Sequence, residues 1–244
     1  MFGTDKTIKI IRNLKKEISS VFNIFFPATC VVCNNNSELI DNLICRNCLG
    51  KIESCKDFCS DCGSVLHEGK CSVCETEAEF DQLFAVLKIN ETARSLIHEF
   101  KYREYKYIGE FLGKLIFELI KDRLIHEKFD IIAPVPLHKV KKRIRGFNQS
   151  EIIAKAISRY SGIPLIADLL KRTVYTDTQT KLSKEERKLN VSEAFTVNKK
   201  YDVKDKKIII VDDVFTTGST MNAVCGTLKR QNVKKSVALT IVRA

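Results

Sequence analysis

The chain has 244 residues, which is enough for one α/β domain and a smaller module. Hydrophobic residues make up 44% of it and charged residues 29%, a balance typical of a soluble globular protein, and no apolar run approaches the ~20 residues of a membrane span. The net charge of +11 is uneven, because residues 30–79 are acidic and residues 80–244 hold most of the positive charge. Phosphate contacts with nucleic acid are therefore expected only from the second of these parts.

The first predicted element is a helix at residues 6–26. Its apolar residues recur near every 3.6 positions with Lys and Arg on the opposite face, the pattern of a basic amphipathic helix. Such a helix can lie on a membrane or dock on its own protein, and Pro27 favours docking because it ends the helix directly before the cysteine-rich segment. Residues 1–29 have no apolar core followed by a small-residue cleavage site, so we expect no secretory signal and a cytoplasmic location.

Eight of the ten cysteines form four CxxC pairs, which is the spacing of a metal site. The pairs are Cys30 with Cys33, Cys45 with Cys48, Cys59 with Cys62, and Cys71 with Cys74. Two pairs complete a tetrahedral Cys₄ site, so residues 30–79 are predicted to form a double zinc ribbon with two structural zinc ions. Short loops favour sequential pairing, and cross-braced pairing stays open. An iron–sulfur cluster and redox disulfides are the rival interpretations.

Residues 80–244 contain strand patterns that alternate with helix patterns. The predicted strands are 83–89, 129–135, 163–166, 194–197, 207–211 and 236–242, and the predicted helices are 92–103, 108–124, 146–160 and 219–231. This alternation predicts an α/β fold with a parallel sheet flanked by helices. The polar stretch 173–190 lacks apolar periodicity, so we expect a long loop of the kind that often closes over a ligand.

Residues 207–220, KIIIVDDVFTTGST, have the strongest functional pattern. An unbroken apolar run predicts a strand buried on both faces, and the carboxylates of Asp212 and Asp213 follow it. Two adjacent carboxylates suit the vicinal hydroxyls of a ribose. The hydroxyl-rich turn at 216–220 can present N–H groups and the positive end of the next helix to one phosphate, and Gly218 allows close approach. The turn lacks the lysine of a P-loop and the glycines of a dinucleotide fingerprint.

A second polar site follows the predicted strand 129–135. The rigid turn PVPLH, residues 134–138, stands at the carboxyl end of that strand, where open parallel sheets bind ligands. Five basic residues then occur within 139–145, and they could neutralise a pyrophosphate, neutralise a nucleic-acid backbone, or only face solvent. The adjacent turn and the sequence RGFNQ favour a ligand.

These motifs resemble those of known families. The segment IIIVDDVFTTGST is similar to the signature of type I phosphoribosyltransferases, which bind phosphoribosyl pyrophosphate (PRPP). The PVPLH turn, the basic residues, RGFNQSE, FKYR, the cysteine pairs, and the pattern RT…Q…L…ER…NV…AF over residues 172–195 resemble the ComF family of phosphoribosyltransferase-like proteins, which is linked to natural competence. The resemblance spans residues 22–243. It implies a type I phosphoribosyltransferase fold over 80–244, behind the helix at 1–29 and the zinc ribbon at 30–79.

The resemblance also implies roles for individual residues. Asp212 and Asp213 are the catalytic acid pair that holds the ribose hydroxyls, and Asp213 is a candidate base. The phosphate loop comprises Val214, Thr216, Thr217, Gly218, Ser219 and Thr220. The pyrophosphate turn comprises Pro134, Val135, Pro136 and Leu137, with Lys139, Arg143 and Arg145 beside it. The closing loop contributes Arg172, Gln179 and Arg187.

Three functions remain open at this point. An enzyme would displace pyrophosphate from C1 of PRPP, with Mg²⁺ neutralising the leaving group. A non-catalytic protein would bind single-stranded DNA through its basic part, with Tyr102, Tyr105 and Tyr107 as stacking platforms. A sensor would bind PRPP without turnover and signal to a partner, such as a protein of the competence machinery, through the zinc module. The sequence indicates no particular nucleobase pocket.

Overall fold

The computed structural model describes residues 29–55, 59, 61, 66, 68–71, 78–102, 106–173 and 194–243. The predicted helix 6–26, Tyr105, Cys62 and Cys74, and the loop residues Gln179 and Arg187 lie outside the described residues. The chain divides into two compact units, Met1–Lys51 and Ile52–Ala244, which are taken in turn.

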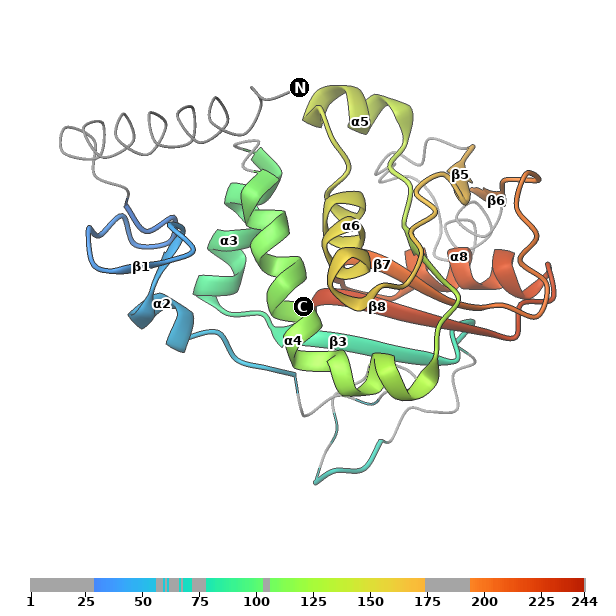
Figure 1. Ribbon diagram of the computed structural model, residues 1–244, viewed down its shortest axis with the longest axis horizontal. Coiled ribbons are helices and arrows are strands. Elements are labelled where there is room, and N and C mark those ends of the chain that lie inside the picture. The colour runs from blue at the N-terminus through green and yellow to red at the C-terminus, as the bar shows by residue number, and fades with distance from the viewer. Residues whose placement is uncertain are drawn as a thin grey trace, which may run out of the picture. The chain divides into compact units, whose positions relative to one another are not determined.

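The first unit holds the first two cysteine pairs on a small antiparallel ribbon. β1 (Leu39–Ile40) pairs with β2 (Ile44–Cys45), and α2 (Arg46–Gly50) follows directly, as Figure 1 shows in blue. Cys45 ends β2 and is also the N-cap of α2, because its sulfur accepts the N–H of Cys48. A helix of five residues is too short to persist alone, so the contacts among the cysteines must hold this unit in shape.

The second unit is built on a parallel sheet, as the alternation of patterns predicts. The strands are β3 (Gln82–Lys88), β4 (Ile131–Pro134), β7 (Lys207–Phe215) and β8 (Lys235–Arg243). Their order in the sheet is β3-β8-β7-β4, and all three pairings are parallel (Figure 1). The central strands β7 and β8 are apolar and buried over most of their length, which is the pattern of strands covered on both faces.

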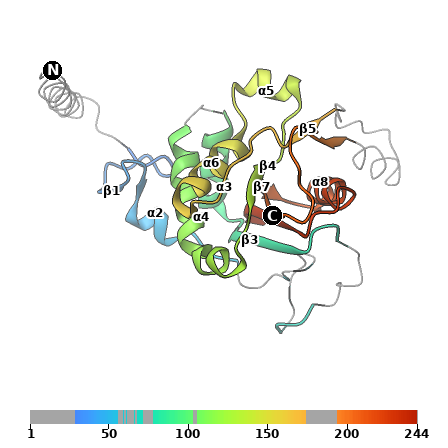
Figure 2. The same ribbon diagram turned by 45° about the vertical axis from the view of Figure 1, so that its right-hand side comes forward.

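Helices cover both faces of this sheet. One face packs against α4 (Lys106–Glu127) and α6 (Gln149–Ser161), with α3 (Glu91–Tyr102) packed on α4, and the other face packs against α8 (Ser219–Lys229), as Figures 1 and 2 show. Helices α4 and α6 lie very close together, because a Cβ added at Gly113 would come within 2.4 Å of the Ala156 Cβ. These two helices therefore need small residues where they cross.

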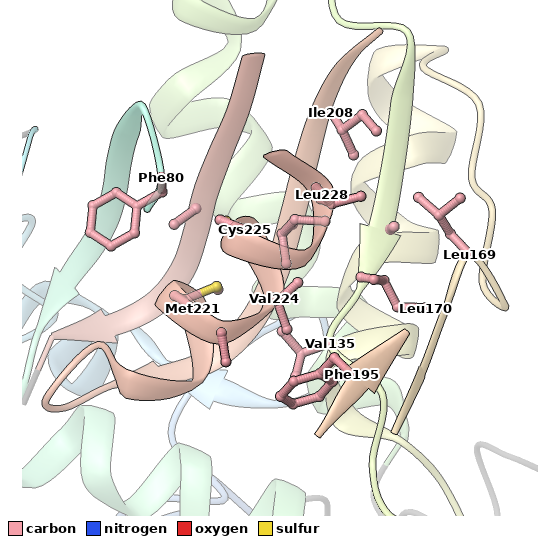
Figure 3. Close-up of a cluster of buried hydrophobic side chains, with 14 of the residues drawn as sticks. Phe80, Val135, Leu169, Leu170, Phe195, Ile208, Met221, Val224, Cys225 and Leu228 are labelled. Atoms are coloured by element: carbon pink, nitrogen blue, oxygen red, sulfur yellow. The ribbon is translucent and has the colours of Figure 1, made fainter. Parts of the chain in front are cut away.

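The core on the α8 side links the sheet to the edge of the predicted ligand site. Met221, Val224 and Leu228 of α8 point at the sheet beside Ile208 of β7, and Val135 lies at the same cluster (Figure 3). A short antiparallel pair, β5 (Leu170–Arg172) with β6 (Phe195–Val197), contributes further apolar side chains to it. Val135 and Phe215 belong to this core. The PVPLH turn and the hydroxyl-rich turn, which are expected to bind ligand, are therefore anchored by apolar packing.

Several elements differ from the sequence prediction. The basic residues at 139–145, for which no helix or strand was predicted, form a short helix, α5 (Lys139–Arg145), because they are good helix formers and the His138 side chain accepts the Val140 N–H at its start. Strand β5 was not predicted, and the expected strand 163–166 is only a bridge between Leu165 and Ile132. The helix predicted from residue 146 starts at Gln149, after the Asn148 cap.

Candidate sugar-phosphate site

The acid pair lies where strand β7 loses one of its two neighbours. We predicted that this strand ends at Val211, but it continues to Phe215, because β8 offers partners up to Arg243. On the other side, β4 ends at Pro134, which pairs with Val211. The carboxylates therefore stand on a strand that is paired on one side only, at the carboxyl edge of the sheet, where ligands of parallel α/β sheets bind.

Asp212 is directed towards the beginning of helix α6. Its Oδ1 accepts the Ser150 hydroxyl at 2.9 Å and the N–H of Asp213 at 2.9 Å. Ser150 is itself placed by Asn148, which caps α6 and also donates from Nδ2 to the Val135 carbonyl at 3.0 Å. Burial, and then the negative charge of Asp213, raise the pKa of Asp212 to about 7, although the hydrogen bonds from Asp213 and Ser150 oppose this shift.

Asp213 contacts a different element. Its Oδ2 lies 2.7 Å from the Nζ of Lys101, in the last turn of α3, and these side chains are only 15% and 20% exposed. Successive side chains of a strand point to opposite faces, so the two neighbouring carboxylates meet different partners. The structure thus brings α3, α6 and β7 together at the acid pair.

Arg172 lies at the end of β5 and interacts electrostatically with Asp212. Its guanidinium carbon is 5.4 Å from the centroid of the Phe195 ring, a cation–π contact with the partner strand. Burial lowers the pKa of Arg172, and the negative charge of Asp212 opposes this shift. The positive charge of Arg172 lowers the negative electrostatic potential that an anionic ligand would meet at Asp212.

The hydroxyl-rich turn has the backbone shape of an anion-binding loop. Gly218 is the N-cap of α8 with φ of 75°, no side chain caps the helix from this position, and a Cβ here would lie 2.7 Å from the Phe215 ring. The hydroxyls of Thr217 and Ser219 are 2.8 Å apart, and both residues are exposed. The positive end of an eleven-residue helix therefore meets a turn whose backbone conformation strongly favours glycine.

Arg243, from the end of β8, supports this turn from behind. Its Nη1 donates to the carbonyl oxygens of Phe215 and Thr216, and its guanidinium carbon lies 4.9 Å from the centroid of the Phe215 ring. Arg243 thus fixes the carbonyl side of the turn, while within the turn the Ser219 N–H donates to the Thr217 hydroxyl oxygen at 3.4 Å. Val214 and Thr220 flank the turn and are half-buried.

The first two residues of the PVP turn are buried in the fold, and the next two are partly accessible. Pro134 and Val135 are buried, the Val135 N–H donates to the Val211 carbonyl, and its own carbonyl accepts from Asn148. Both backbone groups of Val135 are thus used inside the fold, whereas Pro136 and Leu137 are half-buried. In helix α5 the Arg143 side chain is exposed, and the backbone of Lys139 and Arg145 is helical.

The first unit holds a candidate metal centre. The sulfur atoms of Cys30, Cys33, Cys45 and Cys48 all lie within 4.8 Å of one another, so the first pair meets the second, as sequential pairing predicts. The Cys33 and Cys45 sulfurs are 3.8 Å apart, and Zn–S bonds of ~2.3 Å would place two ligands of a tetrahedron about 3.8 Å apart. The donor set therefore fits zinc.

Backbone N–H groups favour the thiolate form in this cluster. The N–H of Cys48 donates to the Cys45 sulfur at 3.4 Å and lowers the pKa of Cys45 to about 6, although burial opposes the shift. Burial raises the pKa of Cys30, but N–H donors, first that of Cys45, outweigh it and the net shift is downward. Burial raises the pKa of Cys48, a cost that a bound cation would offset.

The remaining cysteines are less completely described. In the second set of pairs, Cys59 is buried and Cys71 half-buried, and their partners lie outside the described residues. Cys225, which lies outside the CxxC pairs, is a core residue: it is fully buried against the sheet, and burial raises the pKa of its thiol to about 12.

For four residues of the site, the sequence predicted no individual role. They are Lys101, Asn148, Ser150 and Arg243. The end of a parallel strand was a usable signal for Arg243, since β8 neighbours β7. Asn148 and Ser150 stood inside the RGFNQSE motif, and Lys101 inside FKYR, but nothing local indicated which carboxylate each would approach.

The parallel sheet, the acid pair at its carboxyl edge and the glycine turn at the start of α8 define a phosphoribosyltransferase-type domain. In agreement, a family model described as "Phosphoribosyl transferase domain" matches residues 145–243. Competence protein F of Haemophilus influenzae is 30% identical over 90% of this chain and 99% of its own length. The chain belongs to the ComF family.

Two other relatives have similar coverage. DNA utilization protein YhgH of Escherichia coli K12 is 30% identical over 84% of this chain and 92% of its own length. Competence protein ComFC of Bacillus subtilis is 28% identical over 88% of this chain and 84% of its own length. Within the described part of the chain, no helix combines the length and the apolarity that crossing a membrane would require.

Proposed function

We propose that the protein binds PRPP at the carboxyl edge of its sheet and acts in the cytoplasmic handling of single-stranded DNA during natural competence. The observation that carries the PRPP part is the placement of Asp212 and Asp213 on the same strand that leads into the Gly218 turn. A carboxylate pair accepts vicinal hydroxyls, and a helix N-terminus accepts a phosphate. The names of the relatives, competence protein and DNA utilization protein, support the cellular setting.

We assign each part of the ligand to residues expected at this edge. The N–H groups of the turn, whose carbonyl side Arg243 supports, would bind the 5′-phosphate, and the exposed hydroxyls of Thr217 and Ser219 would add donors. The acid pair would take the ribose hydroxyls. The PVP turn, with the basic residues of α5 after it, would meet the pyrophosphate, as would the loop that includes Gln179 and Arg187.

Transfer of the phosphoribosyl group from PRPP to an acceptor, with release of pyrophosphate, is the reaction that such a complex would perform. The chain's own residues would bind the sugar at both ends and hold C1 in place, and Asp213 is the candidate base. Carboxylate and ligand oxygens suit Mg²⁺, which when bound with PRPP would neutralise the charge of the departing pyrophosphate. A sensor would share the complex but not the turnover, so the two functions differ in one measurable step.

Calorimetry of PRPP in the presence of Mg²⁺ tests the proposal. We expect binding by the wild-type protein and its loss in Asp212→Ala, with Asp122→Ala, on the exposed face of α4, as the matched control that still binds. Pyrophosphate release with a panel of bases then separates an enzyme from a sensor. If the wild-type protein does not bind PRPP, the proposal is wrong.

A second candidate function is direct binding of single-stranded DNA without catalysis. The side chains of Tyr102 and Tyr107 are 64% and 50% exposed, and the basic side chains of Lys106 in α4 and of Lys142 and Arg143 in α5 are exposed as well. Large exposed aromatic side chains with basic residues suit bases and phosphates respectively.

Oligonucleotide affinity should then fall with salt by a slope of roughly −0.7 per neutralised phosphate. Replacing Tyr102 by Ala should weaken binding by about 1–3 kcal/mol, the range for one stacked base, whereas Tyr160→Ala, at the far end of α6, should not. Affinity that is equal at low and high salt contradicts this function.

A further inference from the structure

Lys101 forms an ion pair with Asp213 and comes from a separate element, helix α3. Its Nζ lies 2.7 Å from the Asp213 Oδ2, and the two side chains are 80% or more shielded from solvent. A charge pair shielded in this way interacts much more strongly than one on an open surface. The contact therefore holds a positive charge directly beside the acid pair.

The ion pair is not needed to attach helix α3 to the fold. Leu96, Ile97 and Phe100 of the same helix are already buried, and the Phe100 ring lies 5.8 Å from that of Phe147. A lysine at this position would lower its own desolvation cost by extending into solvent, as lysines at helix ends commonly do. Lys101 instead extends towards Asp213 at the carboxyl edge of the sheet, which indicates that its charge has a function at this site.

We propose that Lys101 is a binding residue that is exchanged between partners, pairing with Asp213 in the empty site and with the anionic group on C1 of a pentose 5-phosphate in the complex. This inference rests on the proposed function. In the complex the ribose hydroxyls donate to Asp213 and replace the donors of the lysine. C1 is bonded to the carbon that bears one of these hydroxyls, so its substituent comes within reach of a flexible side chain that already touches the carboxylate.

Charge balance supports this exchange. Within the described part of the site, Lys101 and Arg172 face the carboxylates of Asp213 and Asp212, so the edge carries no large negative charge before the ligand arrives. Without Lys101, a ligand with several negative charges would meet an uncompensated Asp213. The exchange also specifies the ligand class, because it favours a pentose phosphate with a second anionic group at C1 over one without it.

The test compares two ligands on three variants. PRPP and ribose 5-phosphate share the pentose and the 5′-phosphate and differ in the pyrophosphate at C1. For Lys101→Met we expect PRPP affinity to fall about tenfold or more, the effect of losing one charge-assisted contact, and ribose 5-phosphate affinity to change less than about threefold. Lys101→Arg keeps the charge and should retain most PRPP affinity. Lys121→Met, which removes an exposed lysine of α4 that pairs with Glu118, should match the wild type.

The outcomes separate this inference from the proposed function. Equal losses for both ligands would mean that Lys101 only orients Asp213, and unchanged PRPP affinity in Lys101→Met would mean that it is a spectator; either result overturns the inference and leaves PRPP binding in place. A wild-type protein that binds neither ligand overturns both. Circular dichroism of Lys101→Met that matches the wild type ensures that a loss reflects the contact and not unfolding.

Discussion

The pKa of Asp212 predicts an unusual dependence of stability on pH. Burial and the Asp213 charge raise this pKa from an ordinary value of 3.8 to about 7. The folded protein therefore keeps a proton that the unfolded chain has already released. Stability that is fully present below about pH 4 is lost as the pH rises to about 7, opposite to the usual effect of a salt-bridged carboxylate.

The magnitude follows from the interval between the two pKa values. At 1.36 kcal/mol per unit, the step from 3.8 to about 7 corresponds to about 4 kcal/mol. Asp212 is partly accessible to water, and solvent screening reduces the effect, so we expect about 2 kcal/mol between pH 4.5 and 7.5.

Asp212→Asn isolates this contribution. The amide oxygen can still accept from Ser150 and from the N–H of Asp213, but the group no longer titrates. Urea unfolding of both proteins at several pH values should show the variant gaining stability relative to the wild type as the pH rises through this range. A difference between the two proteins that stays constant from pH 4.5 to 7.5 would refute the reasoning. Ligand affinity in the wild type should rise over pH 6–8, as Asp212 becomes an acceptor for hydroxyls.

Three further changes test the turn and the metal centre. Gly218→Ala should lower stability by about 2–4 kcal/mol in urea unfolding, because φ of 75° strains alanine and its Cβ would meet the Phe215 ring; a loss below 1 kcal/mol contradicts the turn geometry. Arg243→Met should weaken ribose 5-phosphate binding about tenfold in calorimetry, because the carbonyls of Phe215 and Thr216 lose their hydrogen-bond donor. Arg243→Lys should restore part of the affinity, and equal affinity of the wild type and both variants would exclude a supporting role for Arg243. Cys45→Ser should lower the zinc content by about one ion per chain in metal analysis, whereas Cys225→Ser, in the core, should leave it unchanged. A full zinc content in Cys45→Ser would exclude the cluster as a zinc site.

The central elements could be predicted from local sequence patterns. The run at 208–211 is apolar without interruption, which identifies a strand buried on both faces, and the glycine of the following turn has the positive φ that its position suggested. The closeness of the first two cysteine pairs followed from their spacing. Helix α5 was missed because its charged residues have no apolar period, and its stability depends on the His138 cap.

The sequence by itself determined that an acid pair precedes a phosphate-type turn, because both stand on one continuous stretch of chain. Only the tertiary structure decided what surrounds each carboxylate. Ser150 reaches Asp212, Lys101 reaches Asp213, and Arg243 reaches the turn, from elements that are distant along the chain. The physical reason is that side-chain periodicity places a residue on a face of its own helix or strand, whereas the register of the parallel sheet and the packing of the helices decide which of these faces meet.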